Sequence, residues 1–218
     1  MALRPQRVRV HTFIDAQNLY VAVKESFKYQ LPNFDPVKLS EAVTNMMPNR
    51  ELAKVHLYTG IHAREENQFW HDYWRNKLRA LENDPLVNVF TKTLLYHDIK
   101  VKDESGREFS VRRAEEKGID LRIGLDLVRL AVNGTYDVAI IFSQDSDLEE
   151  AVNEVHTIRQ YFDRWIYLES AFPENPTKLP RGIRNTQWRM IVQDIYDACI
   201  DPQDYRPFPT SRPADFQD

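Results

Sequence analysis

Short apolar runs separated by helical patterns are the feature that most limits how this chain can fold. Residues 8–14 (VRVHTFI) and 138–142 (VAIIF) are largely apolar and too short for core helices. Such runs are typical of strands buried on both faces of a parallel sheet. Between them lie amphipathic segments, of which residues 64–82 form the clearest helix. The alternation predicts an α/β fold, a three-layer α/β/α sandwich with a mainly parallel sheet.

The same patterns predict the order of elements along the chain. Strands are expected at residues 8–14, 53–59, 86–95, 138–142 and 165–168, and helices at residues 19–27, 35–47, 64–82, 118–132, 147–158 and 193–199. A charged segment over about 97–114, which turns at Ser105-Gly106, is expected to form an exposed hairpin or flap. The proline-rich and basic stretch 171–184 predicts a loop.

Length and composition indicate one domain with an appendage. Of the 218 residues, 42% are hydrophobic, which is enough for one sizeable core. We expect one domain over residues 1–200 and a proline-rich tail over residues 201–218 that is extended over the surface or frayed. The net charge of −4 does not favour nucleic acid or anionic membranes, so a nucleic-acid partner would need a local basic patch.

Cysteine content and the distribution of apolar residues indicate a compartment. Cys199 is the single cysteine, which excludes an internal disulfide and a multi-cysteine zinc site. Residues 1–10 lack the apolar stretch of a signal peptide, and no segment reaches the roughly 18 apolar residues of a membrane span. We therefore expect a cytoplasmic protein with no membrane partner.

Acidic residues gather where the expected sheet would end. Asp15 follows the first strand, Asp145 and Asp147 follow the strand at 138–142, and Asp120 falls in the first turn of a helix. Ligands of parallel sheets bind at the carboxyl ends of strands, near the topological switch point. Packed carboxylates repel one another unless a cation lies among them, and hard oxygen ligands select Mg²⁺ or Mn²⁺. Each aspartate alone also admits a structural role, because acids in a first helical turn complement the helix dipole.

Three sequence blocks resemble those of the NYN domain, a branch of the PIN-like nucleases. They are FIDAQNLY (13–20), KGIDLRIGLDLV (117–128) and YDVAIIFSQDSDL (136–148), and they follow in order between Arg7 and Glu169. The resemblance implies a PIN-like (Rossmann-like) topology and a metal-dependent ribonuclease, a hydrolase that cuts RNA phosphodiester bonds with a metal-activated water. It leaves open whether such an enzyme is an endonuclease or an exonuclease.

The resemblance also assigns roles to individual residues. The catalytic candidates are Asp15, Asn18, Asp120, Asp126, Asp145 and Asp147. Asp15, Asp120 and Asp145 would bind Mg²⁺ or Mn²⁺, Asn18 would orient the site by hydrogen bonding, and the other two would assist. A regular helix turns about 240° between Asp120 and Asp126, so both cannot face one ion. We expect Asp120 to be the metal ligand. Asp126 is expected to anchor a neighbouring loop or to form an ion pair with a basic residue such as Lys117.

The third block departs from the family pattern at two positions. Where the family usually reads Ser-Gly-Asp-Ser-Asp-Phe, this chain has Gln144 for the glycine and Leu148 for the phenylalanine. Glycine allows close backbone approach or a positive φ, and a side chain at position 144 could partly fill the site. A second hypothesis is therefore a catalytically weakened PIN-like module that binds RNA or protein without cleavage. A third, a metal-dependent nucleotide-sugar transferase based on Asp145-Ser146-Asp147, fits poorly with the short chain and the FIDAQN block.

Basic residues near the expected site could position RNA through its phosphates. The RNA-binding candidates are Arg112, Arg113, Lys117 and Lys24, with Lys28, Arg181 and Arg184 as further ones. Each arginine singly is better explained as part of a solvated face that nearby glutamates, including Glu115 and Glu116, balance. The histidines show no zinc-site spacing, although His62 and His97 could reach the cleft. The flap and the tail could serve as contact surfaces in a homodimer.

Overall fold

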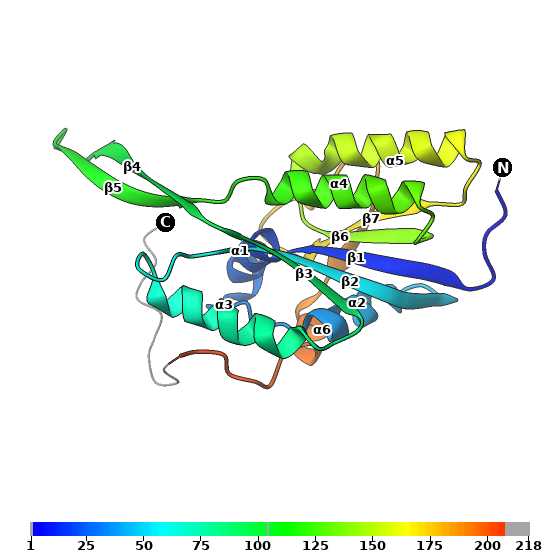
Figure 1. The fold of residues 1–218 in the computed structure, drawn as a ribbon, viewed down its shortest axis with the longest axis horizontal. Helices are drawn as coiled ribbons and strands as arrows, with labels where there is room; N and C mark the ends of the chain where they lie inside the picture. The colour runs from blue at the N-terminus through cyan, green and yellow to red at the C-terminus, as the bar shows by residue number, and fades with distance from the viewer. Residues whose placement is uncertain (1, 104, 208–218) are drawn as a thin grey trace.

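Six parallel strands form the central sheet of the protein (Figure 1). The computed structural model describes residues 2–103 and 105–207. The strands lie in the order β3-β2-β1-β6-β7-β8, and every neighbouring pair is parallel. Their bounds are Val8–Asp15 (β1), Arg50–Ile61 (β2), Val87–Thr93 (β3), Val138–Phe142 (β6), Tyr167–Pro173 (β7) and Gln187–Ile191 (β8).

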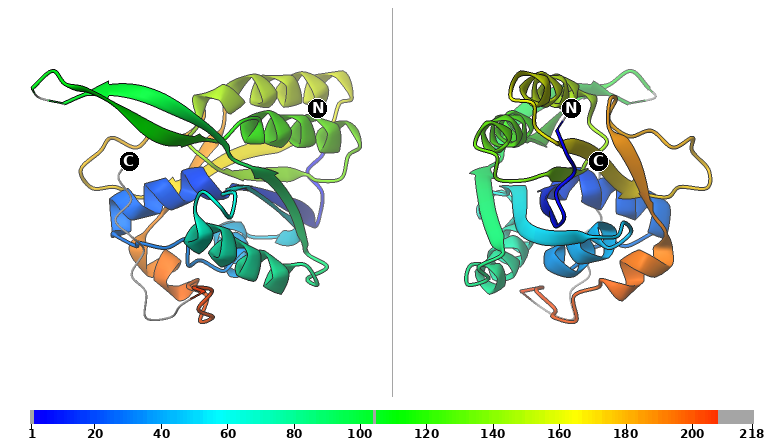
Figure 2. Two further views of the ribbon diagram at one scale, coloured as in Figure 1. Left: turned by 60° about the vertical axis from the view of Figure 1, so that its left-hand side comes forward. Right: turned by 90° about the vertical axis from the view of Figure 1, so that its right-hand side faces the viewer.

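Helices cover both faces of this sheet. One face carries α4 (Ile119–Val132) and α5 (Glu149–Tyr161); the other carries α1 (Ala16–Phe27), α2 (Pro36–Thr44), α3 (Gln68–Leu81) and α6 (Gln193–Ala198). Figures 1 and 2 show the resulting three layers. Each layer boundary has its own hydrophobic core, and the predicted α/β/α sandwich with a mainly parallel sheet is confirmed. No helix in the described part of the chain is long and apolar enough to cross a membrane.

Strand β6 shows why a central strand of this sheet needs an unbroken run of apolar residues. All five of its residues are buried. Val138, Ile140 and Phe142 pack into the core on the α1 side, whereas Ala139 and Ile141 pack against α4 and α5. Because successive side chains of a strand point to opposite faces, a strand covered on both sides must be apolar at every position.

The sheet has one topological switch point, between β1 and β6. From β1 the chain builds outward through β2 to β3, and then returns to place β6, β7 and β8 on the other side of β1. The connections leave in opposite directions at this point, which opens a crevice at the carboxyl ends of the two strands. Asp15 is the last residue of β1, and Asp145 follows the end of β6 by three residues. The two aspartates therefore flank the switch point.

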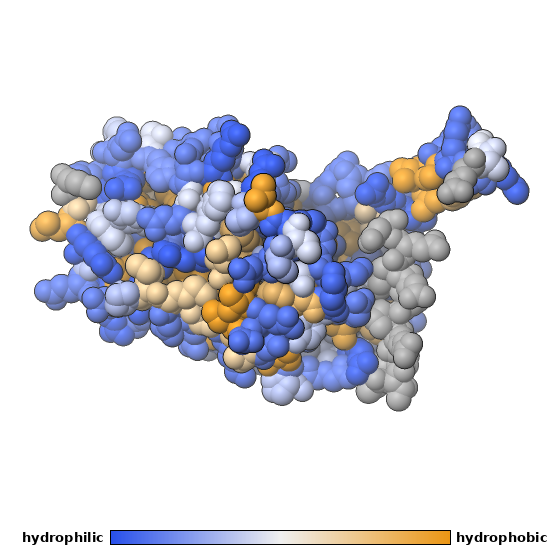
Figure 3. Space-filling model, turned by 180° about the vertical axis from the view of Figure 1, so that it is seen from behind, coloured by the Kyte–Doolittle hydropathy of each residue, from blue (hydrophilic) through white to orange (hydrophobic). Residues whose placement is uncertain are grey.

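A two-stranded antiparallel hairpin projects from the sandwich. It consists of β4 (Leu95–Lys102) and β5 (Glu108–Glu115) and forms a separate sheet. Figures 1 and 3 show it standing clear of the body, and Leu95, Phe109 and Val111 are exposed on it. The hairpin is longer than the predicted flap. The strand expected at 86–95 ends as β3 at Thr93, and the chain enters β4 two residues later.

A buried Arg–Glu–Arg cluster ties β7 to two other strands. The Glu169 side chain is fully buried in β7 and accepts hydrogen bonds from Arg50 (3.0 and 2.6 Å) and Arg189 (2.8 and 2.6 Å). Burial alone would raise the pKa of Glu169, but the hydrogen bonds of Arg189 and Arg50 outweigh it and lower that pKa. Arg50 begins β2 and Arg189 lies in β8, so one carboxylate links three strands.

Two segments near the C-terminus were not predicted. Strand β8 forms the sheet edge, and the segment expected as a loop at 171–184 begins inside β7. The start of the predicted tail is docked, because Tyr205 is buried and its hydroxyl donates to Asp201 (2.7 Å). The buried Lys77 ammonium donates to the Phe34 carbonyl (2.7 Å) and lies 3.8 Å from the Asp201 carboxylate. Residues 208–218 of the predicted tail lie outside the described residues.

Candidate active site

Asp15 occupies the junction of β1 and α1. Its backbone is extended and its Oδ1 accepts a hydrogen bond from the Asn18 N–H (3.0 Å), so it is the N-cap of α1. Only 3% of the residue is exposed. A strand that ends in an N-capping aspartate thus places a carboxylate in the crevice at the switch point, as the FIDAQN pattern predicted.

Asn18 joins this junction to the segment that carries Asp145. The Asn18 Oδ1 accepts a hydrogen bond from the Gln144 N–H (3.0 Å). Asp145 then caps the short 3₁₀ helix η1 (Ser146–Leu148), with its Oδ1 accepting from the Asp147 N–H (2.9 Å). Asn18 thereby holds the two aspartate-bearing turns side by side.

Two further acids come from the chain that connects the hairpin to α4. Asp120 lies in the first turn of α4, which begins after Gly118 in a left-handed conformation (φ +77°). Glu116, just before it, accepts a hydrogen bond from the Gly60 N–H at the end of β2 (2.8 Å). A Cβ atom at position 60 would lie 2.5 Å from the Glu116 Oε2, so a larger residue there would displace this carboxylate. Glu116 is therefore not part of the solvated face on which its charged surroundings in the sequence placed it.

These acids share one open cavity of about 380 Å³. Its polar lining consists of Asp15, Gln17, Asn18, Glu25, Glu116, Asp120, Gln144 and Asp145. We call this cavity the acid pocket. The three predicted metal ligands, which are distant in sequence, therefore line one cavity at the carboxyl ends of β1 and β6.

The electrostatics of the acid pocket are those of uncompensated negative charge. Burial, followed by the charges of Glu116, Asp120 and Asp145, raises the pKa of Asp15 to about 7. Burial and neighbouring carboxylates also raise the pKa values of Glu116 and Asp120. Within residues 2–103 and 105–207, no ion pair joins a basic side chain to any of these four acids. A cation in the pocket would relieve the repulsion.

The donor atoms suit a hard divalent ion, but they are not gathered around one point. Carboxylate and amide oxygens are the ligands that Mg²⁺ and Mn²⁺ prefer. In the part of the chain that the structure describes, however, no group of three or more acidic, histidine or cysteine side chains is arranged to hold a metal ion. Asp120 and Asp145 are partly exposed, so rotation of their side chains toward the buried Asp15 is what binding would require.

Asp126 does not belong to the acid pocket, and its expected catalytic role is not retained. It is buried on another side of α4, where its carboxylate accepts from Arg122 (2.8 Å), Arg129 (2.7 Å) and the Tyr58 hydroxyl (3.1 Å). The six-residue spacing from Asp120 explains this placement. Asp126 does bind basic residues, although they are these two arginines rather than Lys117.

Asp147 lies at the rim of the acid pocket. It is exposed, and its charge contributes to the raised pKa of Asp120, after burial and the charge of Asp145. It does not line the cavity itself. The side chain therefore adds negative potential to the entrance.

The predicted RNA-binding residues are distributed around the site. Arg112 on the hairpin donates to Glu66 and lies over the Tyr96 ring, and Lys117 pairs with Glu115 (3.5 Å). Arg113 is exposed on β5. Lys24 lines a cavity of about 320 Å³ that also contains Trp70, Trp74 and His62. This cavity adjoins the acid pocket, since Gln17, Val21 and Glu25 line both, and Lys117 directly follows Glu116 of the acid pocket.

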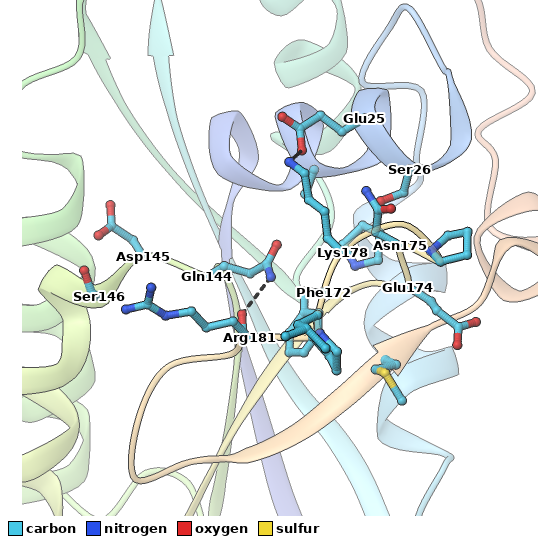
Figure 4. A pocket seen from close by; sticks show the side chains of 16 residues that line it. Glu25, Ser26, Gln144, Asp145, Ser146, Phe172, Glu174, Asn175, Lys178 and Arg181 are labelled. Carbon is cyan, nitrogen blue, oxygen red and sulfur yellow. Dashed lines mark hydrogen bonds and ion pairs between the residues drawn. The ribbon is translucent and has the colours of Figure 1, made fainter.

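Gln144 fits its position without backbone strain. It is not among the residues with positive φ, so the local backbone does not require glycine. Its side-chain nitrogen donates to the Arg181 carbonyl (2.7 Å), as Figure 4 shows. Gln144 nevertheless is one of the residues that line the acid pocket.

The fold and the acid pocket together define an α/β protein of the PIN-like type, with the carboxylates at the switch point of a parallel sheet. The family model of the NYN domain matches residues 9–174, and the chain belongs to the NYN domain family. NYN domains are PIN-like nucleases, a class that generally uses divalent metals. The predicted family membership is confirmed.

Solved structures and curated proteins add little beyond this family. A Vibrio parahaemolyticus protein of unknown function is 17% identical, with a TM-score of 0.44 over 94% of this chain and 98% of that chain. Ribokinase from Giardia lamblia is 9% identical, with a TM-score of 0.35 over 66% of this chain and 42% of that chain. No curated protein matches the chain.

The raised pKa of Asp15 predicts a pH-dependent loss of stability. The folded-state pKa is about 7, above the ordinary value of 3.8. As the pH rises from about 4 to about 7, the unfolded chain ionises Asp15 more readily than the folded chain does, so stability falls and stays low above pH 7. Asp15→Asn keeps the capping oxygen. It is expected to raise Tm by roughly 5 °C at pH 8 in EDTA and to change it little at pH 4.

The measurement is thermal unfolding at both pH values, with the exposed Asp194→Asn as a matched control. If Tm differs between Asp15→Asn and wild type by the same amount at pH 4 and pH 8, ionisation of Asp15 does not destabilise the folded protein.

Proposed function

We propose that this protein is a divalent-metal-dependent ribonuclease that hydrolyses RNA phosphodiester bonds. The observation that carries the proposal is the acid pocket, where Asp15, Glu116, Asp120 and Asp145 line one cavity at the switch point. Membership of a nuclease family and the suitability of oxygen donors for Mg²⁺ or Mn²⁺ support it. Four uncompensated carboxylates have no evident value for stability, whereas they suit a cation-binding site.

Each residue of the acid pocket has a role in this proposal. Asp15, Asp120 and Asp145 would hold the ion, which supplies a water of lowered pKa and positive charge beside the leaving oxygen. Asn18 positions the two turns that bear Asp15 and Asp145. Glu116, whose pKa burial raises, is suited to accept a proton from the attacking water. Lys24, Arg112, Arg113 and Lys117 would contact RNA phosphates.

The proposal predicts cutting that depends on added metal. Purified protein with a 5′-labelled RNA of mixed sequence is expected to produce fragments in Mn²⁺ or Mg²⁺ and none in EDTA, with activity restored by excess metal. Gel electrophoresis of the products is the measurement. Internal fragments from a circular RNA would identify an endonuclease. Equal cleavage with and without EDTA would exclude this mechanism.

A second candidate function is an RNA-binding module that does not cleave. Two observations favour it: Gln144 lines the acid pocket where the family usually has glycine, and no three-ligand metal group is present among the residues that the structure describes. In that case wild type and Asp15→Asn would bind RNA equally well, and neither would cut it in Mn²⁺.

A further inference from the structure

A second cavity adjoins the acid pocket. It has a volume of about 610 Å³ and lies between α1, the ends of β7 and β8, and the loop that follows β7. Its wall is shared with the acid pocket at Ala22, Glu25, Gln144 and Asp145. Figure 4 shows Gln144 between Asp145 on one side and Asn175 and Lys178 on the other. We call this second cavity the side pocket. A ligand bound in the acid pocket can therefore extend into it.

The side pocket combines an apolar floor with hydrogen-bonding groups of both kinds. Phe172 and Met190 supply apolar surface. Gln144 donates its amide N–H to the Arg181 carbonyl (2.7 Å), and its amide oxygen is turned the other way, into the cavity (Figure 4). The Asn175 Oδ1 accepts from the Thr177 N–H (3.0 Å) and hydroxyl (2.7 Å), which leaves the Asn175 NH₂ group to donate. The cavity thus offers a fixed acceptor and a fixed donor beside apolar walls.

Basic side chains lie at the edges of the side pocket. Lys178 forms an ion pair with Glu25 (2.6 Å) across the cavity mouth and neutralises that acid. In the described part of the chain Arg181 has no ion-pair partner, and Figure 4 shows its guanidinium group extending toward Ser146 and Asp145. A guanidinium at the junction of the two cavities is suited to a phosphate group.

These features fit a nucleotide better than other small ligands. A cavity of this size accepts a small organic molecule. A nucleobase is planar, stacks on apolar or aromatic side chains, and carries both donors and acceptors on its edges. With the base in the side pocket, the adjoining phosphate would lie at the junction, near Arg181 and Asp145.

We propose that the side pocket binds the base of the nucleotide next to the scissile phosphate, so that RNA cleavage depends on the identity of that base. This rests on the proposed ribonuclease function. The base must leave a helix to enter a cavity, so the substrate class is single-stranded or looped RNA rather than duplex RNA.

The test separates base binding from cleavage. Affinities of the four ribonucleoside 5′-monophosphates and of ribose 5-phosphate, which lacks a base, are measured by calorimetry with Mg²⁺ present. At least one nucleotide is expected to bind about tenfold more tightly than ribose 5-phosphate. Ser26→Leu, which fills the cavity from α1, and Asn175→Ala, which removes the donor, are expected to abolish most of that difference. The exposed Asn83→Ala is the matched control and is expected to retain it.

Cleavage ends from an RNA library of random sequence complete the test. A base bias beside the cut that Asn175→Ala removes and Asn83→Ala keeps supports the proposal. If cutting occurs without any base bias and all nucleotides bind like ribose 5-phosphate, the base-binding proposal is wrong while the ribonuclease proposal stands. If nothing is cut but base-dependent binding persists and is lost in Ser26→Leu, the ribonuclease proposal fails and the side pocket is still a nucleotide site.

Discussion

Asp145→Asn is expected to slow Mn²⁺-dependent RNA cleavage by about a thousandfold. Asparagine keeps the shape of the side chain and an oxygen for the Asp147 N–H, but it removes one negative charge from the acid pocket. Loss of an anionic ligand weakens metal binding and the stabilisation of the leaving oxygen, which is worth several kcal/mol in metal-ion catalysis. The measurement is the single-turnover rate at saturating metal, with circular dichroism to verify folding.

Two aspartates provide controls for this experiment. Asp194→Asn, in an exposed position on α6, is expected to cut at the wild-type rate. Asp126→Asn is expected to keep cutting too, because its carboxylate is bound by Arg122 and Arg129 outside the acid pocket. A wild-type rate in Asp145→Asn would remove that residue from the mechanism. If Asp126→Asn folds normally but loses as much cleavage rate as Asp145→Asn, Asp126 takes part in the mechanism after all.

Glu169→Ala is expected to lower the free energy of unfolding by about 3–5 kcal/mol, a fall in Tm of roughly 10 °C. The substitution leaves Arg50 and Arg189 without the carboxylate that both contact, and the Arg50 side chain is only 7% exposed. An unpaired buried charge is the costly outcome, since the intact cluster itself contributes little over apolar packing. Urea unfolding followed by fluorescence measures the change.

Glu154→Ala on the exposed side of α5 is the matched control, and it is expected to change stability by less than about 0.5 kcal/mol. Replacing all three members of the cluster by apolar residues is expected to recover most of the lost stability. A Glu169→Ala protein as stable as the Glu154→Ala protein would show that the two arginines find other partners or water.

The parts of the fold that were predictable are those in which local pattern and tertiary environment agree. An apolar run such as β6 can be satisfied only between two helical layers, and an aspartate at its end caps the element that follows. The sequence pattern does not predict strand β8, because β8 lies at the edge of the sheet. Its Trp188 and Met190 are nearly half exposed, so burial imposes no apolar pattern on it. The break between β3 and β4 is not predicted either, because only one residue separates the two strands and no turn residue marks the break.

The candidate site divides in the same way. Asp15, Asp120 and Asp145 follow from positions at element ends, which a sequence displays. Glu116 does not, because its place in the acid pocket depends on a contact with Gly60, 56 residues earlier, and on the turn at Gly118. The sequence feature that could have indicated Glu116 as a site residue is its position four residues before Asp120. Helical geometry separates Asp126 from Asp120, and its partners Arg122 and Arg129 are near neighbours on the same helix. Its contact with Tyr58 depends instead on how α4 packs against the sheet.

The central position of β1 in the sheet has a consequence for how the protein folds during its synthesis. β1 is made first but lies between β2 and β6, and its Val10 pairs with Val138. On the ribosome, the β1–β2 pair can form early, whereas the β6 side of β1 stays open until Asp145 has been added. A nascent chain therefore exposes an unpaired apolar strand edge until β6 has been made. The acid pocket likewise cannot form before the segment that carries Asp145 has been made, because Asp15 alone lies at the end of β1.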